Sequence, residues 1–460
     1  MRKSAALLLA LVFLTASSIV AINPVLAPTI DEDSWTMKTA MPTARSGLGV
    51  AVVNGKIYAI GGLNDDGYLA TCEEYDPATN SWVAKKHMPT SRSNFAVIVV
   101  ENKIYAIGGL TGDDTPTGVN EVYDPATDMW ENKTSMPTPR WLLQANVVNA
   151  KIYLIGGLGG RHVNEVYDPA TDSWTTKTPP PTSVDDYASV VVDNKIYLIG
   201  GHEGYGSYSN QNQIYDPETD TWSSGQQAPQ KTVYAAAGVT SGVMAPKRVY
   251  VLGVTEPIGI GVNIGVRVPS IINQVFDPEN DSWTIGASPL TNRINMGVAV
   301  VDDKLYAIGG STYEDSGLHV PHMPSAVNEQ YTPIGYGTVP PTIRVVSPEN
   351  KTYVSSNVSL AFTVNKPASW MGYSLDSQDN VTITGNTTLA GLANGSHNIT
   401  VYAKDEFENT GASETVTFTI AKETEAFPIR LAVVTAIVVA ALVLLAAVGV
   451  GLSAYLKKRK

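Results

Sequence analysis

Apolar and polar residues follow one recurring order along much of the chain. In residues 95–109 an apolar run is followed by a polar turn and by a second apolar run that ends in two glycines. A third segment then ends in Tyr-Asp-Pro, and a polar turn leads to a tryptophan, here Trp130. The runs are short and almost wholly apolar, which favours β-strands that are covered on both faces. Each copy therefore predicts four short strands, here at residues 95–100, 104–107 and 119–123 and around Trp130.

This order recurs six times between residues 33 and 333. The glycine pairs begin at residues 61, 108, 156 and 200, which gives a period of 44 to 48 residues. The fifth copy has Gly253-Val254 in place of the pair, and the sixth lacks the tryptophan. A glycine can adopt a positive φ or admit a close backbone neighbour, and Asp-Pro starts a tight turn. A repeat of this length predicts a solenoid or a propeller.

The Gly-Gly, Tyr-Asp-Pro and Trp motifs together resemble the kelch repeat. Four copies also carry an arginine ahead of their first strand, namely Arg45, Arg92, Arg140 and Arg293. The resemblance covers about residues 33–333 and implies an all-β fold, a six-bladed kelch β-propeller with one four-stranded blade per repeat. The motifs identify the fold but say little about function, because kelch propellers include enzymes, adhesins and adaptors.

The missing sixth tryptophan predicts how the propeller closes. Residues 33–36 read Asp-Ser-Trp-Thr, which matches the segment around Trp174 in the third copy. We therefore expect Trp35 to lie on the fourth strand of the last blade. This N-terminal strand would pair with residues 293–331 and remove a sheet edge that otherwise invites aggregation.

The rest of the chain predicts a domain order typical of a membrane-anchored surface protein. Residues 1–27 read as a signal peptide, with a basic start and an apolar run. A linker at residues 334–341 is rich in glycine and proline. Residues 431–456 are apolar throughout and predict a transmembrane helix, and the basic residues 457–460 predict a short cytoplasmic tail. The expected location is a single-pass cell membrane protein with its N-terminal domains extracellular.

Residues 342–421 predict a β-sandwich. Strands are expected at residues 342–346, 357–364, 370–375, 381–384, 397–403 and 414–420. Motifs such as Ser347-Pro348-Glu349-Asn350 and Tyr402-Ala403-Lys404-Asp405 resemble Ig-like modules of prokaryotic, especially archaeal, surface proteins. The resemblance implies a stalk.

Composition limits the partners and the compartment. The net charge of −12 argues against nucleic acid or anionic lipid as a ligand. The single cysteine, Cys72, allows no intramolecular disulfide, and we expect it to be a small buried filler rather than a redox or metal residue. Eight Asn-x-Ser/Thr sequons predict a glycoprotein with a glycosylated stalk, and an archaeal envelope is the expected setting. The sequons lie at Asn132, Asn280, Asn350, Asn357, Asn380, Asn386, Asn394 and Asn398.

The predicted topology separates two faces of the propeller. We expect the turns between strands 1 and 2 and between strands 3 and 4 to be short in every copy and to share one face. The loops between strands 2 and 3 and the linkers between copies share the other face, and their length varies. Loop insertions on one face of a repeat fold commonly mark the binding side. The longest loops include an apolar stretch at residues 258–265, which we interpret as a contact patch.

The variable face carries the candidate ligand-binding residues. Aromatic rings mixed with carboxylates and guanidinium groups suit sugar recognition and suit a protein interface equally well. The alternative is that the arginines are structural and the other residues are ordinary loop polars. The candidates are Arg45, Asp65, Tyr68, Arg92, Arg140, Trp141, Arg161, His202, Glu203, Tyr205, Tyr313 and His319, and the linkers add Asp185 and Asp186.

Motifs for chemistry are nearly missing from the sequence. His319 and His322 lie close together in one loop, but no third metal ligand can be named, so we expect no metal and no cofactor. We therefore favour extracellular binding or adhesion, with a carbohydrate or an envelope protein as the partner. The alternative is an extracellular sugar-modifying enzyme resembling sialic acid epimerases, with Glu203 or His202 as the acid/base group. An enzyme should show carboxylate or histidine groups with perturbed pKa values converging at the central channel.

Overall fold

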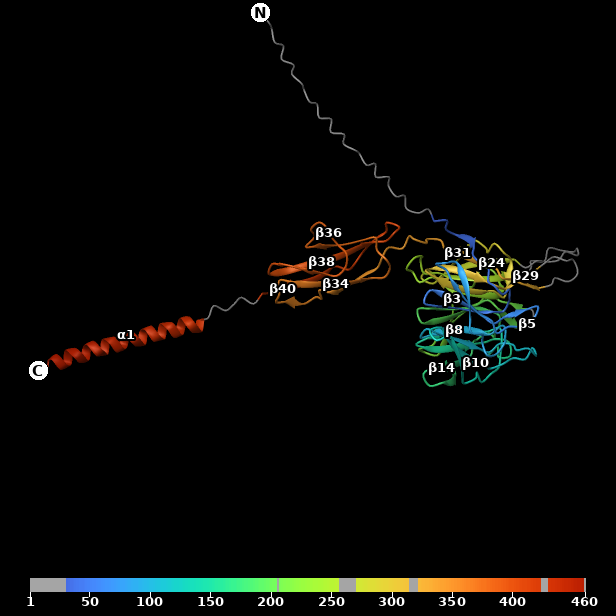
Figure 1. The fold of residues 1–460 in the computed structure, drawn as a ribbon, viewed down its shortest axis with the longest axis horizontal. Helices are drawn as coiled ribbons and strands as arrows, with labels where there is room; N and C mark the ends of the chain where they lie inside the picture. Colours follow the sequence, from blue (N-terminus) through green and yellow to red (C-terminus); the bar gives the residue numbers. More distant parts are fainter. Residues whose placement is uncertain (1–29, 205–206, 256–269, 314–321, 423–428, 459–460) are drawn as a thin grey trace, which may run out of the picture.

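The computed structural model describes residues 30–204, 207–255, 270–313, 322–422 and 429–458. Most of these residues form β-strands, and one helix, α1 (Ile429–Lys457), lies at the C-terminal end of the described chain. Figure 1 shows two groups of strands along the long axis, with the larger group formed by the earlier part of the chain. The nearly all-β prediction is confirmed, and the sequence repeats can be matched to individual sheets.

Within the described residues the larger group contains six four-stranded antiparallel sheets, which we call the ring. The first sheet comprises β2 (Gly49–Val53), β3 (Lys56–Ile60), β6 (Cys72–Asp76) and β7 (Ser81–Lys85). The second comprises β8 (Ala96–Val100), β9 (Lys103–Ile107), β10 (Asn120–Asp124) and β11 (Met129–Lys133). The third comprises β12 (Gln144–Val148), β13 (Lys151–Ile155), β14 (Asn164–Asp168) and β15 (Ser173–Thr176).

The remaining three sheets follow the same order. The fourth comprises β16 (Ala188–Val192), β17 (Lys195–Ile199), β20 (Asn212–Asp216) and β21 (Thr221–Ser224). The fifth comprises β22 (Thr232–Val239), β23 (Val249–Thr255), β24 (Ile271–Asp277) and β25 (Ser282–Gly286). The sixth comprises β27 (Gly297–Val301), β28 (Lys304–Ile308), β31 (Asn328–Thr332) and β1 (Ser34–Met37).

The sheets pack face to face around a closed circle. The first strands β2, β8, β12, β16, β22 and β27 each contact the next one in this order, and β27 contacts β2. Each apolar cluster lies between two neighbouring sheets; in one of them Ile60 and Ala51 of the first sheet meet Ile104 and Ala106 of the second. The strands are therefore covered on both faces, as their nearly continuous apolar runs predict. Cys72 is buried in the same cluster, and burial raises the pKa of its thiol to about 12, which suits an inert filler.

The circle closes through β1, as the sequence predicts. Trp35 lies opposite Tyr331 in an antiparallel pair with β31. Its ring stacks on Tyr331 at a centroid distance of 5.0 Å, and its Nε1 donates to the carbonyl of Ala287 in the neighbouring repeat at 2.8 Å. The N-terminal strand thus completes the last sheet by the same contacts that the other sheets make.

Hydrogen bonds of the tryptophan and Tyr-Asp-Pro motifs link neighbouring sheets. In the second sheet Trp130 Nε1 donates to the carbonyl of Lys86 at 2.8 Å. Asp128 accepts the backbone N–H of Lys86 at 2.9 Å and the hydroxyl of Tyr123 at 2.6 Å. The fourth-strand tryptophans of the other five sheets donate in the same way to the repeat before them: Trp35, Trp82, Trp174, Trp222 and Trp283. The motif therefore holds the sheets together as well as ending a strand.

The glycine pair is required both by its positive φ values and by the close approach of a neighbouring backbone. Gly108 and Gly109 have φ values of 74° and 99°. A Cβ on Gly108 would lie 2.7 Å from the carbonyl oxygen of Arg140 in the next repeat, too close for any side chain. In the turn that follows, Asp124 accepts the backbone N–H of Ala126 at 2.9 Å, as expected for Asp-Pro.

Short hairpins lie on one face of the ring. Three lie between the second and third strands of their repeats: β4 (Leu63–Asn64) with β5 (Gly67–Tyr68), β18 (His202–Gly204) with β19 (Ser207–Tyr208), and β29 (Ser311–Tyr313) with β30 (His322–Pro324). β26 (Arg293–Ile294), in a linker, pairs with β29. Other linker residues form single bridges to the same loops, such as Ser46 to Leu63 and Asp185 to His202. The prediction that these loops and linkers share a face is confirmed, and we call it the loop face.

Residues 343–420 form two further sheets, which we call the two-sheet unit. One contains β32 (Ile343–Ser347), β34 (Val358–Val364) and β37 (Thr387–Leu389). The other contains β33 (Thr352–Tyr353), β40 (Val416–Ile420), β38 (Gly395–Lys404), β35 (Trp370–Leu375), β36 (Val381–Ile383) and β39 (Thr410–Ala412). Leu360 and Phe362 from the first sheet pack on Ile399 and Phe418 from the second. All six strands predicted here are present, and the structure adds β33, β37 and β39.

The two-sheet unit contacts the ring on the side opposite the loop face. On this side the turn between β22 and β23 spans residues 240–248 and is longer than the short turn predicted for every copy. Within the ring, the carboxylate of Asp303, in the turn between β27 and β28, accepts four backbone N–H groups of residues 241–245 and holds this long turn in place. Gly337 N–H donates to the carbonyl of Met244, and Tyr336 packs edge-on against Phe407 at 6.3 Å. Because turns between first and second strands lie opposite the second-to-third loops, the loop face points away from this junction, as β5 and β29 do in Figure 1.

The C-terminal helix matches the predicted membrane span. Residues Val434–Lys457 have a mean hydropathy of 2.7 over the most apolar window and are not buried inside the molecule. In the part of the chain that the structure describes this is the one helix that is long and apolar enough to cross a bilayer. The predicted signal peptide at residues 1–27 lies outside the described residues.

Candidate functional site

Six residues form a circle where the central channel opens on the loop face, and we call them the mouth ring. They are Gly47, Asn94, Leu142, Asp186, Tyr234 and Asn295. Each precedes the first strand of its sheet by one or more residues or lies where that strand begins, and each has a positive φ between 50° and 58°. The left-handed backbone costs about 1 kcal/mol or more for a residue other than glycine, so its repetition in five such residues marks a strained feature.

Backbone hydrogen bonds join the mouth ring from sheet to sheet. Asn94 N–H donates to the carbonyl of Gly47 at 2.8 Å, and Leu142 N–H donates to that of Asn94 at 3.0 Å. The series continues to Asp186 at 3.0 Å, and Gly47 N–H donates to Asn295 at 2.9 Å. These four bonds link five of the six members, and they explain why the strained backbone persists there, since each bond satisfies backbone groups of two neighbouring sheets. They also hold the side chains of the mouth ring at fixed positions around the channel.

The channel is almost closed behind the mouth ring. Leu48, Phe95, Leu143, Ala235 and Met296, one position further along the chain, line the cavity and leave about 60 Å³ of space. Small-molecule sites usually measure about 300–1,000 Å³, whereas a single water occupies about 30 Å³ in the liquid. The cavity can therefore hold water or a small group of a ligand, and the bulk of any ligand would lie on the loop face.

A cluster of charged side chains borders the mouth ring at the fourth sheet. Asp185 and Asp186 precede β16, His202 begins β18, and Arg161 comes from the loop between β13 and β14. Arg161 Nε forms an ion pair with Asp185 Oδ2. His202 Nδ1 lies 3.4 Å from Asp185 Oδ1 and 4.0 Å from Asp186 Oδ2. We call these four residues the Asp-His cluster.

The Asp-His cluster raises the pKa values of two of its groups, Asp186 and His202. Burial raises the pKa of Asp186 to about 7, with the nearby Asp185 charge adding to the effect and His202 opposing it. Hydrogen bonding to Asp185 raises the pKa of His202. Asp186 Oδ2 is buried and has no hydrogen-bond partner among the described residues. Convergent groups of this kind are what a site for acid/base chemistry, or for a ligand donor group, requires.

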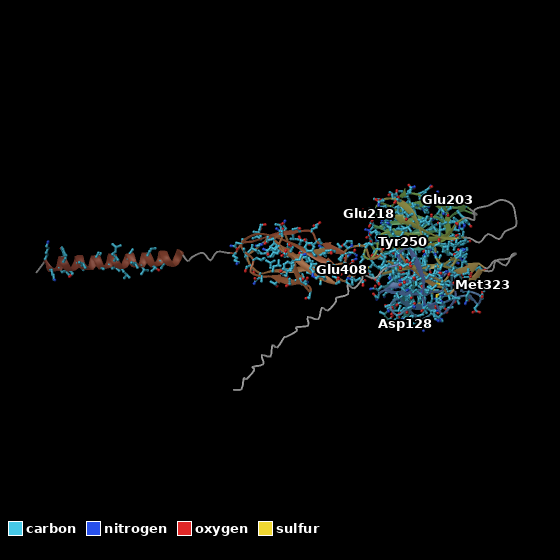
Figure 2. The ribbon with its side chains drawn as sticks, turned by 90° about the horizontal axis from the view of Figure 1, so that it is seen from above. Asp128, Glu203, Glu218, Tyr250, Met323 and Glu408 are labelled. Atoms are coloured by element: carbon cyan, nitrogen blue, oxygen red, sulfur yellow. The ribbon has the colours of Figure 1, made fainter. Side chains whose placement is uncertain are left out.

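Aromatic rings surround the histidine. The ring of His202 lies 5.2 Å from that of Tyr208 and meets the ring of Tyr234 edge-on at 6.2 Å. Glu203 accepts the hydroxyl hydrogen bond of Ser209 at 2.6 Å. Figure 2 shows Glu203 and Met323 on the side of the ring away from Glu408 of the two-sheet unit. The site thus combines charged, hydroxyl and aromatic groups on the outward face.

Three predicted ligand-binding residues are not on the face at all. Arg45, Arg92 and Arg140 have no exposed surface. Arg45 pairs with Glu73 at 2.7 Å, Arg92 pairs with Glu121 at 2.8 Å, and Arg140 pairs with Glu165. Each guanidinium also donates to backbone carbonyls of its own repeat. The prediction that they contact ligand is wrong, because the sheets enclose these arginines and their charge is used within the fold.

The other predicted residues differ in position. Arg161, His202 and Glu203 come together at the Asp-His cluster. Trp141 bridges to Leu158 on the loop face, and the Tyr68 hydroxyl donates to Asp114 of the next repeat, which leaves both away from the cluster contacts. Asp65 is exposed in the turn between β4 and β5. Tyr205 and His319 lie outside the described residues, and Tyr313 is described only as part of β29.

Sequence reasoning missed the mouth ring as a set, and with it Tyr234. The signal was present, because every member lies two residues after the position of the repeat arginine. Arg92 leads to Asn94, and the replaced positions Val184 and Thr232 lead to Asp186 and Tyr234. In the described residues no group of three or more His, Cys, Asp or Glu side chains is arranged to hold a metal ion.

The raised pKa of Asp186 predicts how the stability of the folded chain changes with pH. Its pKa of about 7 in the folded chain lies above the usual value of about 3.9, so folding is penalised increasingly as pH rises from about 4 to about 7. Asp186→Asn removes the ionisable group and should raise the melting temperature relative to the parent, with a difference that grows from pH about 5 to pH about 8. Thermal unfolding across that range measures it, with Asp65→Asn as the control. A difference independent of pH would contradict the assignment.

Comparison with known proteins agrees with the arrangement of sheets. Residues 104–323 match the Attractin/LZTR1 beta-propeller family, and residues 27–157 match the KLHDC2/KLHL20/DRC7 Kelch-repeats domain. Kelch-repeat β-propeller domains are therefore present in the chain. The structure of YjhT is similar over 64% of this chain and 96% of that chain, with a TM-score of 0.51 and 17% sequence identity, which is a likeness of fold alone.

Two curated proteins share shorter segments. Halomucin of Haloquadratum walsbyi is 28% identical over 194 residues, which is 36% of this chain. Kelch-like protein 41a of Danio rerio is 44% identical over 59 residues, which is 13% of this chain. The chain spans only 2% and 10% of the length of these two relatives. The similarity therefore does not extend to the whole length of these proteins.

Proposed function

We propose that this chain is a membrane-anchored extracellular protein whose loop face binds carbohydrate. In this proposal residues 33–333 are a six-bladed kelch propeller, residues 342–421 are an Ig-like stalk, and residues 431–456 cross the cell membrane with the C-terminus inside. The observation that carries the proposal is that the Asp-His cluster and the contacts with residues 334–421 lie on opposite faces of the ring. A site directed away from the stalk is available to ligands outside the cell.

The chemistry of the site favours a sugar. Carboxylate, imidazole and guanidinium groups can each bond to hydroxyls, and the rings of Tyr208 and Tyr234 can cover an apolar sugar face. The small cavity behind the mouth ring, with the unpartnered Asp186 oxygen beside it, suits a single projecting donor group. A protein partner is the remaining alternative, since tyrosine and arginine also serve as anchors in protein interfaces.

The test is binding of the detergent-solubilised full chain to a broad glycan array. We expect selective binding that falls about tenfold or more in His202→Gln, since a hydrogen bond to a charged group contributes roughly 1.5–3 kcal/mol. Lys103→Gln, on the opposite turn face, is the matched control and should bind like the parent. If His202→Gln leaves binding unchanged, the glycan binds elsewhere on the chain. If the parent binds no glycan, a protein ligand is favoured.

A second function, sugar modification, is favoured by the shifted pKa values of Asp186 and His202. A carboxyl group with a pKa of about 7, beside an imidazole whose pKa is raised, can exchange protons with a bound sugar, as an epimerase-like reaction requires. Incubation with sialic-acid-type sugars, followed by NMR of the ring protons, tests this. Turnover that is lost in both Asp186→Asn and His202→Gln would support an enzyme, and the absence of turnover in the parent would leave binding alone.

A further inference from the structure

The two-sheet unit has a polar groove on its solvent side, remote from the loop face. Along β38 the residues alternate strictly, with Ile399, Val401 and Ala403 in the core. Asn398, Thr400 and Tyr402 therefore point outward, and all three are only partly exposed. Together with Ser374, Asn380 and Thr417 they line a groove of about 770 Å³.

The groove has the chemistry of a saccharide-binding surface. Its lining consists mostly of hydroxyl and amide side chains, and Asp379 is the one charged residue among the lining residues described. The hydroxyls of Thr400 and Thr415 bond to each other at 2.8 Å, which orders that wall. Tyr402 supplies an aromatic ring on which a sugar can stack, while hydroxyls and amides can act as both donors and acceptors. Its size falls in the range of about 300–1,000 Å³ usual for ligand sites.

We propose that the groove is occupied by the chain's own N-linked glycan, attached to Asn398. Asn398, Ile399 and Thr400 form a sequon, and the two-residue period of a strand places its asparagine and its threonine on the same face. A sugar joined to Asn398 must leave its half-buried side chain along the groove. The other sequon asparagine in the groove, Asn380, is exposed at the end of a loop, so its glycan is free to point into solvent.

This inference rests on the proposed extracellular placement, because N-glycosylation requires export. The full chain is expressed in a host that glycosylates exported proteins, and glycopeptides are mapped by mass spectrometry. A native endoglycosidase time course then compares Asn398 with Asn350, whose sequon is exposed and outside the groove. We expect release from Asn398 to be about tenfold slower, equal release from both after denaturation, and loss of the difference in Tyr402→Ala but not in Tyr402→Phe.

The outcomes separate this inference from the proposed function. An Asn398 without glycan, or one whose glycan is released as fast as that of Asn350, overturns the inference while modification at other sequons still supports export. Modification at no sequon overturns both. If unglycosylated protein instead binds soluble saccharides through Tyr402, the groove takes a foreign sugar and the chain's own glycan is not its occupant. Slow release that depends on the Tyr402 ring supports the inference.

Discussion

Deletion of residues 31–40 is expected to open the ring of sheets and cause the chain to aggregate. β1 is the fourth strand of the sixth sheet, and without it β31 would present an unpaired edge. Trp35 would be lost from the apolar cluster it shares with Tyr250 and Tyr331, and Asp33 would be lost as the acceptor for Ala287 N–H. Trp35→Ala alone should destabilise the fold by about 3–5 kcal/mol, as for other buried tryptophans.

Denaturant unfolding and light scattering measure these effects. The matched control is Met37→Ala on the same strand, because the Met37 side chain is 55% exposed and its removal leaves no cavity. The control should cost less than about 0.5 kcal/mol, as is usual at exposed positions. A deletion variant that remains monomeric with an unchanged melting temperature would show that the ring does not depend on β1.

The strands of the ring could be predicted closely from the sequence because each signal is local and recurs. The expected strand at residues 104–107 is observed as Lys103–Ile107, and that at 119–123 is observed as Asn120–Asp124. An apolar run bounded by a polar turn and a glycine pair leaves little freedom in where a strand can end. The closing strand was predictable for the same reason, since the motif missing from the last copy is found around Trp35.

The candidate site was predicted only in part because it depends on contacts between repeats. Arg161, Asp185 and His202 lie far apart in sequence, and only the pairing of a linker with a loop brings them together. The segment around each repeat arginine also does not show whether its side chain points into the fold or toward solvent. Arginine is mostly exposed in proteins, so the motif alone favoured the surface.

A second pattern in the sequence does identify the arginines as structural. The residue two positions before the Tyr or Phe of each third strand is a glutamate wherever the repeat has its arginine: Glu73, Glu121, Glu165 and Glu329. The two repeats that lack the arginine, with Val184 and Thr232 in its place, have Gln213 and Gln274 instead. Gln213 exchanges hydrogen bonds with the backbone of Thr182, and Gln274 does so with Gln230. The arginine and its glutamate are therefore either both present or both replaced by uncharged residues, as expected for a buried ion pair.

Replacing Arg92 by valine should be among the most damaging single changes in the ring. Its guanidinium and the Glu121 carboxylate have side-chain exposures of 0% and 1% and lie 2.8 Å apart. The guanidinium also donates to the carbonyls of Ala106 and Val119. Arg92→Val leaves the buried Glu121 carboxylate without its cationic partner and removes one donor from each of two carbonyls, so the free energy of unfolding should fall by about 3–5 kcal/mol. Urea denaturation of the purified chain measures this change.

The fourth repeat supplies the matched control, since it contains valine and glutamine at the equivalent positions. Arg92→Val combined with Glu121→Gln should recover most of the lost stability, because removing both charges removes the cost of burying one of them. The surface pair of Lys103 with Asp124, 3.7 Å apart, gives the scale for an exposed interaction, and Lys103→Gln should cost less than about 1 kcal/mol. The double variant should also keep any ligand binding of the loop face, since neither side chain reaches that surface. A double variant no more stable than Arg92→Val would show that the arginine contributes through its carbonyl contacts rather than through the ion pair, and loss of binding in a stable double variant would restore Arg92 as part of the ligand site.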